Sequence, residues 1–128
     1  MFDWRTYLAL ADELAQRTEE AALRAALSRA YYAAFGVACD YLGDEKVTTR
    51  KLGTHEQRWE VFRDIPSAAS QTLRGTLLKR AYELKGLRHA ADYKKSRVIS
   101  ANDAQKALGL AKEVIEIIAK LPPLLASP

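Results

Sequence analysis

The segment 19–42 is predicted to form one long helix around which the rest of the chain folds. It contains no proline and only one internal glycine, Gly36, so no residue in it would break a helix. Its apolar residues recur at helical spacing along two seams instead of one. The seams comprise Leu23, Leu27, Ala30, Ala34, Val37 and Tyr41, and Ser28, Tyr31, Phe35, Cys39 and Leu42. A helix with two apolar seams packs against neighbours on more than one side, so we expect this one at the centre of a small bundle.

Length and composition indicate one globular domain. The chain has 128 residues, of which 48% are hydrophobic and 28% are charged. We expect a single domain over residues 1–128, with a core large enough to be stable without disulfides or metals. Cys39 is the only cysteine, which excludes an internal disulfide and favours a cytoplasmic location. The N-terminal residues include Asp3 and no long apolar run, so neither a signal peptide nor a membrane span is predicted.

Four further helices are predicted from apolar periodicity and from helix-end signals. They cover residues 3–16, 54–65, 67–93 and 100–121, and the second of them is short. Trp59 and Phe62 are the expected core anchors of the short helix. No segment carries a strand signal. The prediction is therefore an all-α fold, an antiparallel up-and-down bundle of four long helices plus one short helix.

The residues at the predicted helix ends support these boundaries. The expected N-caps are Asp3, Thr18, Thr54 and Ser100, and the last two form capping boxes with Gln57 and Asp103. Gly43 is a suitable left-handed stop for the helix 19–42, and Pro66 separates the short helix from the next one. Gly75 and Gly86 lie inside the helix 67–93, where each costs about 1 kcal/mol relative to alanine, so they are expected to mark a bend or a close contact.

Several motifs, taken in order along the chain, resemble the HEPN domain family. The motifs are WRTYLALADEL near the N-terminus, SRAYYAAF in the central helix, THEQ after the loop, and LRHAADY at the end of the helix 67–93. The resemblance covers nearly the whole chain. It implies a small up-and-down helical bundle that is often a homodimer and is often found beside a minimal nucleotidyltransferase. Many members of the family bind or act on RNA or nucleotides, and the catalytic ones are metal-independent ribonucleases, several of them toxins of toxin–antitoxin pairs.

The catalytic signature of the family is an arginine followed, after four to six residues, by a histidine on the same helix. In this sequence no histidine follows Arg29 or Arg88 at that distance on either long helix. His89 is next to Arg88, so its side chain points about 100° away around the helix. His55 follows Arg50 at the right distance, but Gly53 and the expected cap at Thr54 lie between them. The candidates for a catalytic acid–base group are therefore His55 and His89, and the alternative for His55 is a packing role in the first turn of the short helix.

The phosphate-binding or nucleic-acid-binding candidates are Arg29 on the central helix and, at and after the end of the helix 67–93, Arg88, Asp92, Tyr93, Lys94, Lys95 and Arg97. Arg88 and Asp92 are one turn apart, a spacing that suits an ion pair, and Asp92 with Tyr93 matches the ADY motif of the family. Two interpretations stay open: a network that ties Arg88 and Asp92 to Arg29 on the central helix, or a polar cleft for phosphate. Tyr31 and Tyr32 likewise have two interpretations, packing in the core or at a dimer seam, and stacking on bases.

Basic residues are concentrated in the same part of the chain. Residues 79–97 carry seven basic and two acidic side chains, a net charge of +5 in a chain whose total is +4. The basic side chains are Lys79, Arg80, Lys85, Arg88, Lys94, Lys95 and Arg97. Such a concentration binds phosphates through counterion release, and its alternative is a solvated face with long lysine side chains.

Three functions are compatible with these features. The first is a HEPN-type module that binds RNA or a nucleotide, or pairs with a nucleotidyltransferase antitoxin, without the usual catalytic arginine–histidine pair. The second is a metal-independent ribonuclease toxin, and the third is a helical adaptor without a ligand. Two histidines and one cysteine at wide spacing give no metal-site pattern, and we expect no cofactor.

Overall fold

The structure is a computed structural model, and it describes residues 1–43, 55–64 and 71–122. Within these ranges every regular element is an α-helix, which confirms the all-α prediction. The helices are α1 (Arg5–Ala15), α2 (Glu20–Leu42), α4 (His55–Asp64), α5 (Gln71–Tyr93) and α6 (Ala101–Lys120). No helix of the described ranges is both long enough and apolar enough to cross a membrane.

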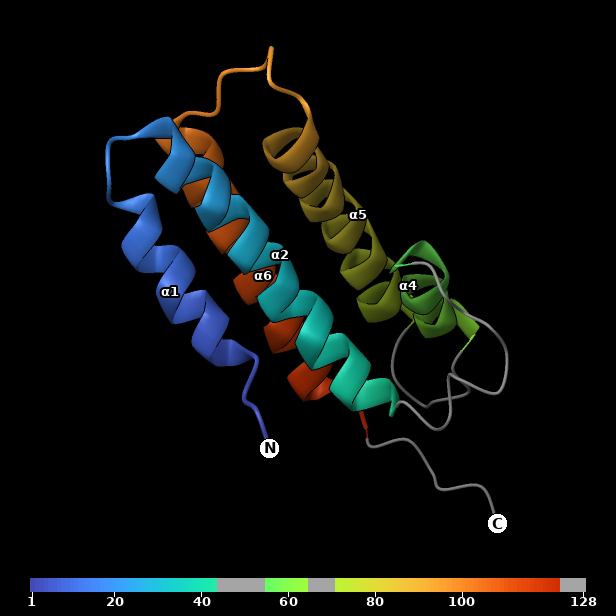
Figure 1. The fold of residues 1–128 in the computed structure, drawn as a ribbon. Helices are drawn as coiled ribbons and strands as arrows, with labels where there is room; N and C mark the ends of the chain where they lie inside the picture. The colour runs from blue at the N-terminus through green and yellow to red at the C-terminus, as the bar shows by residue number, and fades with distance from the viewer. Residues whose placement is uncertain (44–54, 65–70, 123–128) are drawn as a thin grey trace.

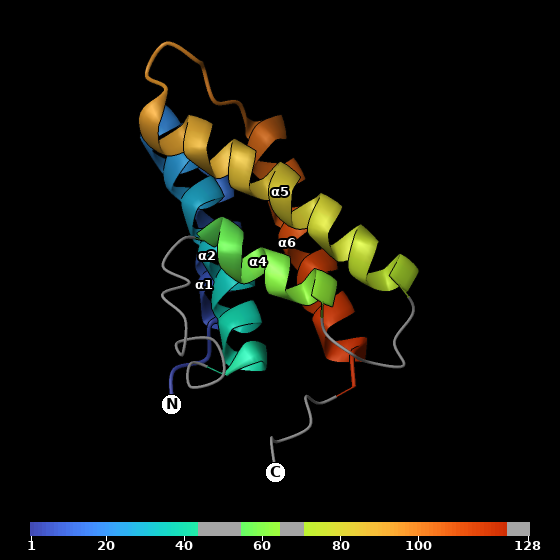
Figure 2. The ribbon, with the colours of Figure 1, turned by 90° about the vertical axis from the view of Figure 1, so that its right-hand side faces the viewer.

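The helices form a bundle with α2 at its centre (Figure 1). α2 packs against α1, α5 and α6, and α5 also packs against α6. α4 packs mainly against α5, and Figure 2 shows it beside the N-terminal half of that helix. The predicted central position of the segment 19–42 is therefore confirmed.

The contacts of α2 depend on alanine. Small side chains let neighbouring helix backbones approach closely, and the gaps between them are filled by larger groups from α2 itself and its partners. The buried alanines of α2 are Ala22, Ala26, Ala30, Ala33, Ala34 and Ala38. Leu27 and Tyr31 of α2 are fully buried, and so are the predicted anchors Trp59 and Phe62 of α4.

The start of α6 and the end of α2 agree with the prediction. Ser100 and Asp103 form the capping box of α6, since the backbone N–H of each is bound by the side chain of the other. Gly43 ends α2 with φ of 74° and donates its N–H to the carbonyl of Cys39 at 2.9 Å. This positive φ is the reason that a glycine stands there.

The predicted cap of α2 is wrong, because its N-cap residue is Glu19 and not Thr18, and Glu19 makes no side-chain capping bond. Asp3 does make the predicted capping bond at the start of α1. Its carboxylate accepts the backbone N–H of Arg5 at 3.0 Å, and it also accepts the guanidinium of Arg5 at 3.0 Å. The predicted cap at Thr54, the stop at Pro66 and the helical start at residues 67–70 lie outside the described residues.

The glycines of α5 do not mark close contacts. A Cβ atom built on Gly75 or Gly86 would meet nothing within 4 Å, because both residues are exposed. Gly36 of α2 is different, since its Cβ would lie 2.2 Å from the Cγ and Cδ2 atoms of Trp4. The indole of Trp4 therefore rests directly on the α2 backbone, and a side chain at position 36 would displace it.

The C-terminal end of α5 is closed by an arginine from α2. The guanidinium of Arg24 donates to the carbonyls of Ala90 (3.3 Å), Ala91 (2.8 Å) and Lys94 (3.2 Å), and also to that of Arg97. These include carbonyls in the last turn of a helix, which have no partner within the helix itself. Glu20, one turn before Arg24, holds the guanidinium at 2.9 Å and accepts the backbone N–H of Ile99 at 3.1 Å.

Replacing Gly36 by alanine is expected to lower the free energy of unfolding by about 1–3 kcal/mol, because Trp4 must move or the helices must separate. The control is Gly109→Ala in α6, where an added Cβ meets nothing within 4 Å. That variant is expected to gain about 0.5–1 kcal/mol from helix propensity. Urea unfolding measures the free energy of unfolding of both variants. If the two substitutions changed it equally, the packing of Trp4 on α2 would not require a glycine at position 36.

Replacing Arg24 by methionine is expected to destabilise the protein by about 2–4 kcal/mol, because the carbonyls at the end of α5 lose a charged donor. The matched control is Arg17→Met. Arg17 pairs with Glu19 but its side chain is 60% exposed, so its loss should cost less than about 0.5 kcal/mol. Thermal unfolding of the two variants provides the comparison, and similar melting temperatures would refute a capping role for Arg24.

Candidate functional site

A buried tyrosine hydroxyl joins α2 to α4. Tyr31 of α2 has no exposed surface, and its hydroxyl accepts a hydrogen bond from Nε1 of Trp59 at 3.1 Å. The same oxygen lies 2.9 Å from Nδ1 of His55. Because the indole can only donate, the hydroxyl proton of Tyr31 is available for His55, whose Nδ1 then accepts. Burial raises the pKa of Tyr31 to about 12, so the hydroxyl keeps this proton.

His55 lies in the first turn of α4 and is packed among aromatic rings. Its imidazole stacks on the ring of Phe35, with centroids 4.1 Å apart and planes 22° apart. Burial is the main cause that lowers its pKa below the usual value, and the positive charges of Arg88, Lys85 and Arg58 lower it further. The imidazole is therefore neutral at pH 7. His55 therefore lies in the first turn of α4 and packs on Phe35, and it also lies in the electrostatic field of Arg88.

Arg88 of α5 is buried against the same tyrosine. Only 8% of its surface is exposed, and its guanidinium lies over the rings of Tyr31 (5.1 Å), Tyr32 (5.7 Å) and Tyr93 (5.8 Å). Asp92, one turn later, binds Nη1 of Arg88 at 3.4 Å. We call Arg88, Asp92 and these three tyrosines the Arg88 cluster.

The Arg88 cluster does not use all the donors of its arginine. Nε of Arg88 is buried and has no hydrogen-bond partner within the part of the chain that the structure describes. Asp92 also accepts a long hydrogen bond, 3.5 Å, from the hydroxyl of Ser28 on α2. The predicted one-turn pair of Arg88 and Asp92 is thus present, but it is a single contact that leaves the guanidinium with further capacity for an acceptor.

Arg29 lies apart from the Arg88 cluster. Its guanidinium lies over the ring of Tyr7 of α1, 5.1 Å from the centroid. No bond between Arg29 and Arg88 or Asp92 is present among the described residues. The network through Arg29 that the sequence suggested is therefore replaced by one through Ser28, the preceding residue of α2.

The exposed side of the Arg88 cluster is basic and partly aromatic. Tyr93 is 67% exposed, and the basic residues Lys94, Lys95 and Arg97, which we call the basic rim, are exposed in the segment that follows it. His89 is also exposed and packs against Tyr93, with ring centroids 5.0 Å apart. Arg97 is held 3.5 Å from Asp103 at the start of α6. These residues give the end of α5 a positive surface beside the buried guanidinium.

Other basic residues of the segment 79–97 have different roles. Arg80 forms an ion pair with Glu113 of α6 at 2.8 Å, so it ties α5 to α6. Lys85 of α5 lies close enough to His55 of α4 to lower its pKa, a proximity that no sequence pattern indicates. Cys39 is half-buried, and its sulfur accepts a bond from Arg58 at 3.4 Å. Within the described ranges no three His, Cys, Asp or Glu side chains lie close enough together to hold a metal ion.

Comparison of the chain with protein-family models, with curated proteins and with solved structures found no match.

The stability of the protein is expected to fall below pH 6.5 because of His55. The pKa of His55 is lowered in the folded state, so its contribution is complete above the unfolded value of about 6.5 and is lost as pH falls through the folded pKa. The variant His55→Gln should therefore lose less stability than the wild type between pH 7.5 and 5. Urea unfolding across this pH range tests the prediction, and parallel curves for wild type and His55→Gln would contradict it.

Proposed function

We propose that this protein is a HEPN-type helical module that binds RNA or a nucleotide phosphate at the Arg88 cluster and does not cleave it. The proposal includes the antiparallel up-and-down bundle of that family, a homodimeric, cytoplasmic protein, and a nucleotidyltransferase antitoxin as the protein partner. The observation that carries it is the guanidinium of Arg88, which is buried among three tyrosine rings and has one ion-pair contact, at 3.4 Å.

The geometry of the Arg88 cluster suits a phosphate. A guanidinium held by aromatic rings loses little freedom on binding, and its fork of N–H donors matches two phosphate oxygens. Asp92 competes with an incoming phosphate for Nη1 of Arg88. In the free protein its carboxylate therefore takes the place of one phosphate oxygen, through a weak contact. Exposed Tyr93 offers a ring on which a base can stack, and the basic rim adds attraction that does not depend on sequence.

The absence of cleavage follows from the positions of the two histidines. His55 uses Nδ1 to bind Tyr31 and is packed on Phe35, so it serves the attachment of α4. His89 is exposed and packs on the ring of Tyr93. Neither histidine makes a hydrogen bond to Arg88 or Asp92 within the described chain.

A metal-independent ribonuclease is the second candidate function, and one observation favours it. His55 is neutral at pH 7 and is joined through Tyr31 to the ring on which Arg88 lies. A neutral imidazole beside a phosphate-binding arginine is the pair that general acid–base cleavage of RNA needs. In this alternative His55 would be the base and Arg88 would hold the phosphate.

Asp92→Asn is expected to strengthen RNA binding several-fold, because the amide no longer competes with phosphate for Arg88. Arg88→Lys should weaken binding by about tenfold, since lysine keeps the charge but loses the fork. Lys112→Gln, at an exposed position of α6 away from the cluster, is the control for a lost positive charge. Gel shifts with mixed single-stranded RNA at two salt concentrations and in EDTA measure these affinities.

The same experiment separates the three functions. Binding without cleavage that strengthens in Asp92→Asn supports the proposed module. RNA cleavage in EDTA that His55→Gln abolishes would establish the ribonuclease instead. If wild type neither binds nor cleaves RNA, the Arg88 cluster is a structural ion pair and the adaptor function is favoured. Circular dichroism of each variant establishes that it is folded.

A further inference from the structure

His55 and Arg88 lie against the same two tyrosine rings of α2. The imidazole of His55 stacks on the ring of Tyr31, with centroids 5.6 Å apart, and meets the ring of Tyr32 edge-on at 5.8 Å. The guanidinium of Arg88 lies 5.1 Å and 5.7 Å from the centroids of the same rings. A positive charge on His55 would therefore lie near a fixed positive charge, among partly buried rings where water screens the repulsion poorly.

The other charged groups that face His55 add to this repulsion. Lys85 of α5 and Arg58 of α4 act on it together with Arg88, and all three are positive. The groups that face it from α2 are the two tyrosines and a phenylalanine. Burial is the first cause that lowers the pKa of His55, and Arg88 is the first of the charges that lower it further.

Protonation of His55 also reverses its hydrogen bond with Tyr31. In the neutral imidazole Nδ1 accepts the hydroxyl proton, whereas a protonated Nδ1 must donate. The oxygen of Tyr31 has two lone pairs, so it can accept from both His55 and Trp59. The attachment of α4 is thereby kept. The hydroxyl proton loses its acceptor, a cost that does not depend on the charge of Arg88.

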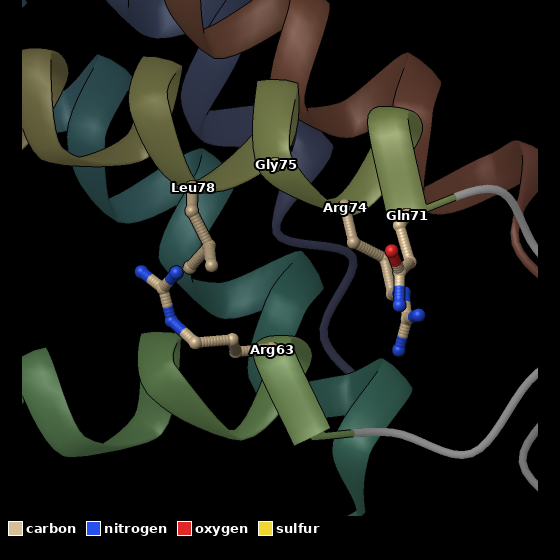
Figure 3. Close-up of a pocket in the computed structure, with 5 residues that line it drawn as sticks. All are labelled: Arg63, Gln71, Arg74, Gly75 and Leu78. Atoms are coloured by element: carbon tan, nitrogen blue, oxygen red, sulfur yellow. The ribbon is translucent and has the colours of Figure 1, made fainter.

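The charged groups at the other end of α4 do not face His55. Arg63 lies roughly 12 Å from His55 along the axis of α4, given the rise per residue of an α-helix. Figure 3 shows Arg63 there, where it lines a pocket of about 250 Å³ beside the start of α5. Its Nε and Nη2 donate to Glu60 at 3.0 and 3.4 Å, and the hydroxyl of Tyr82 also binds Glu60. Arg63 and Tyr82 lower the pKa of Glu60, so this carboxylate stays ionised above pH 5.

We propose that binding of a phosphate at the Arg88 cluster is coupled to the uptake of a proton by His55, a regulation that rests on the proposed function. A phosphate on the guanidinium offsets the positive charge that most opposes protonation of the imidazole. Nε of Arg88, buried and without a partner among the described residues, is a donor that such a ligand can use. The bound protein therefore favours the imidazolium more than the free protein does, and by reciprocity the imidazolium favours the phosphate.

The direction of the pH effect follows from this coupling. The pKa of His55 is lowered in the free protein, and the ligand raises it from that value. The affinity is then independent of pH well above the bound-state pKa. It rises as pH falls through the bound-state pKa and stops rising below the free-state pKa. One coupled proton changes the affinity by at most about tenfold per pH unit.

Binding of fluorescent oligouridylate without terminal phosphates tests the proposal, because neither uracil nor a phosphodiester titrates between pH 5 and 8. The chain has two histidines, so all measurements use His89→Gln, in which His55 is the remaining one. Its affinity at constant ionic strength should rise at least about threefold between pH 7.5 and 5. The matched control is the double variant with His55→Gln, since glutamine can accept the hydroxyl of Tyr31 but does not titrate. Its affinity should not change with pH.

Nuclear magnetic resonance of the imidazole of His55 in His89→Gln gives a second, direct readout. The midpoint of its titration should move to higher pH when oligouridylate saturates the protein. An unmoved midpoint would overturn the coupling. Equal pH dependence of binding with and without His55 would also overturn it and would assign the effect to Asp92, which competes for Arg88.

The same data separate this coupling from the proposed function. If oligouridylate binds with one affinity from pH 5 to 8, the coupling is wrong while the phosphate-binding module stands. If it binds at no pH, the proposed function fails and the coupling fails with it. Circular dichroism at each pH establishes that both variants are folded.

Discussion

The hydroxyl of Tyr31 is the interaction on which the polar interior of this bundle depends. It is fully buried, and it receives the indole N–H of Trp59 and faces Nδ1 of His55. Its ring also carries the guanidinium of Arg88. One side chain of α2 therefore determines where α4 docks and where the charge of α5 is held. Loss of either partner would leave a buried polar group without one of its bonds, so the two bonds favour one relative position of these three helices.

The other contacts of α2 combine small apolar side chains with a few specific polar bonds. Alanines bring its neighbours close, and Gly36 brings Trp4 into direct contact with the backbone. At the N-terminal end, Arg24 and Glu20 bind the backbone where α5 ends and the connection to α6 begins. The central helix thus contacts both ends of the α5–α6 connection through backbone groups, which constrain geometry more strongly than apolar packing does.

The sequence predicted the elements well because their signals are local. Periodicity located all the helices described, and the Ser100 capping box and the Gly43 stop were read from single residues. The predicted cap at Thr18 lies one residue before the observed N-cap, Glu19, whereas Asp3 makes the capping bond expected of it. Propensity at a helix end is a preference of about 1 kcal/mol, and tertiary contacts outweigh it.

The candidate site was predictable only where its residues share a helix. Arg88, Asp92 and Tyr93 lie within two turns of α5, and their proximity followed from spacing. The contacts of His55 with Tyr31, and of Arg24 with the end of α5, join residues far apart in the chain. No period or motif encodes such pairs, because they depend on how helices cross.

The attachment of α4 has a consequence for how this bundle opens. α4 contacts α2 through a small aromatic cluster and its hydrogen bonds, and otherwise it packs mainly on α5. By contrast, each of α1, α2, α5 and α6 packs against at least two of the other three. We expect α4 to behave as a separate cooperative unit of local unfolding, with amide protection set by a smaller opening free energy than that of α2. Each such opening would bring the indole of Trp59 into water, so the intrinsic fluorescence of the protein would report a sub-global equilibrium before global unfolding begins.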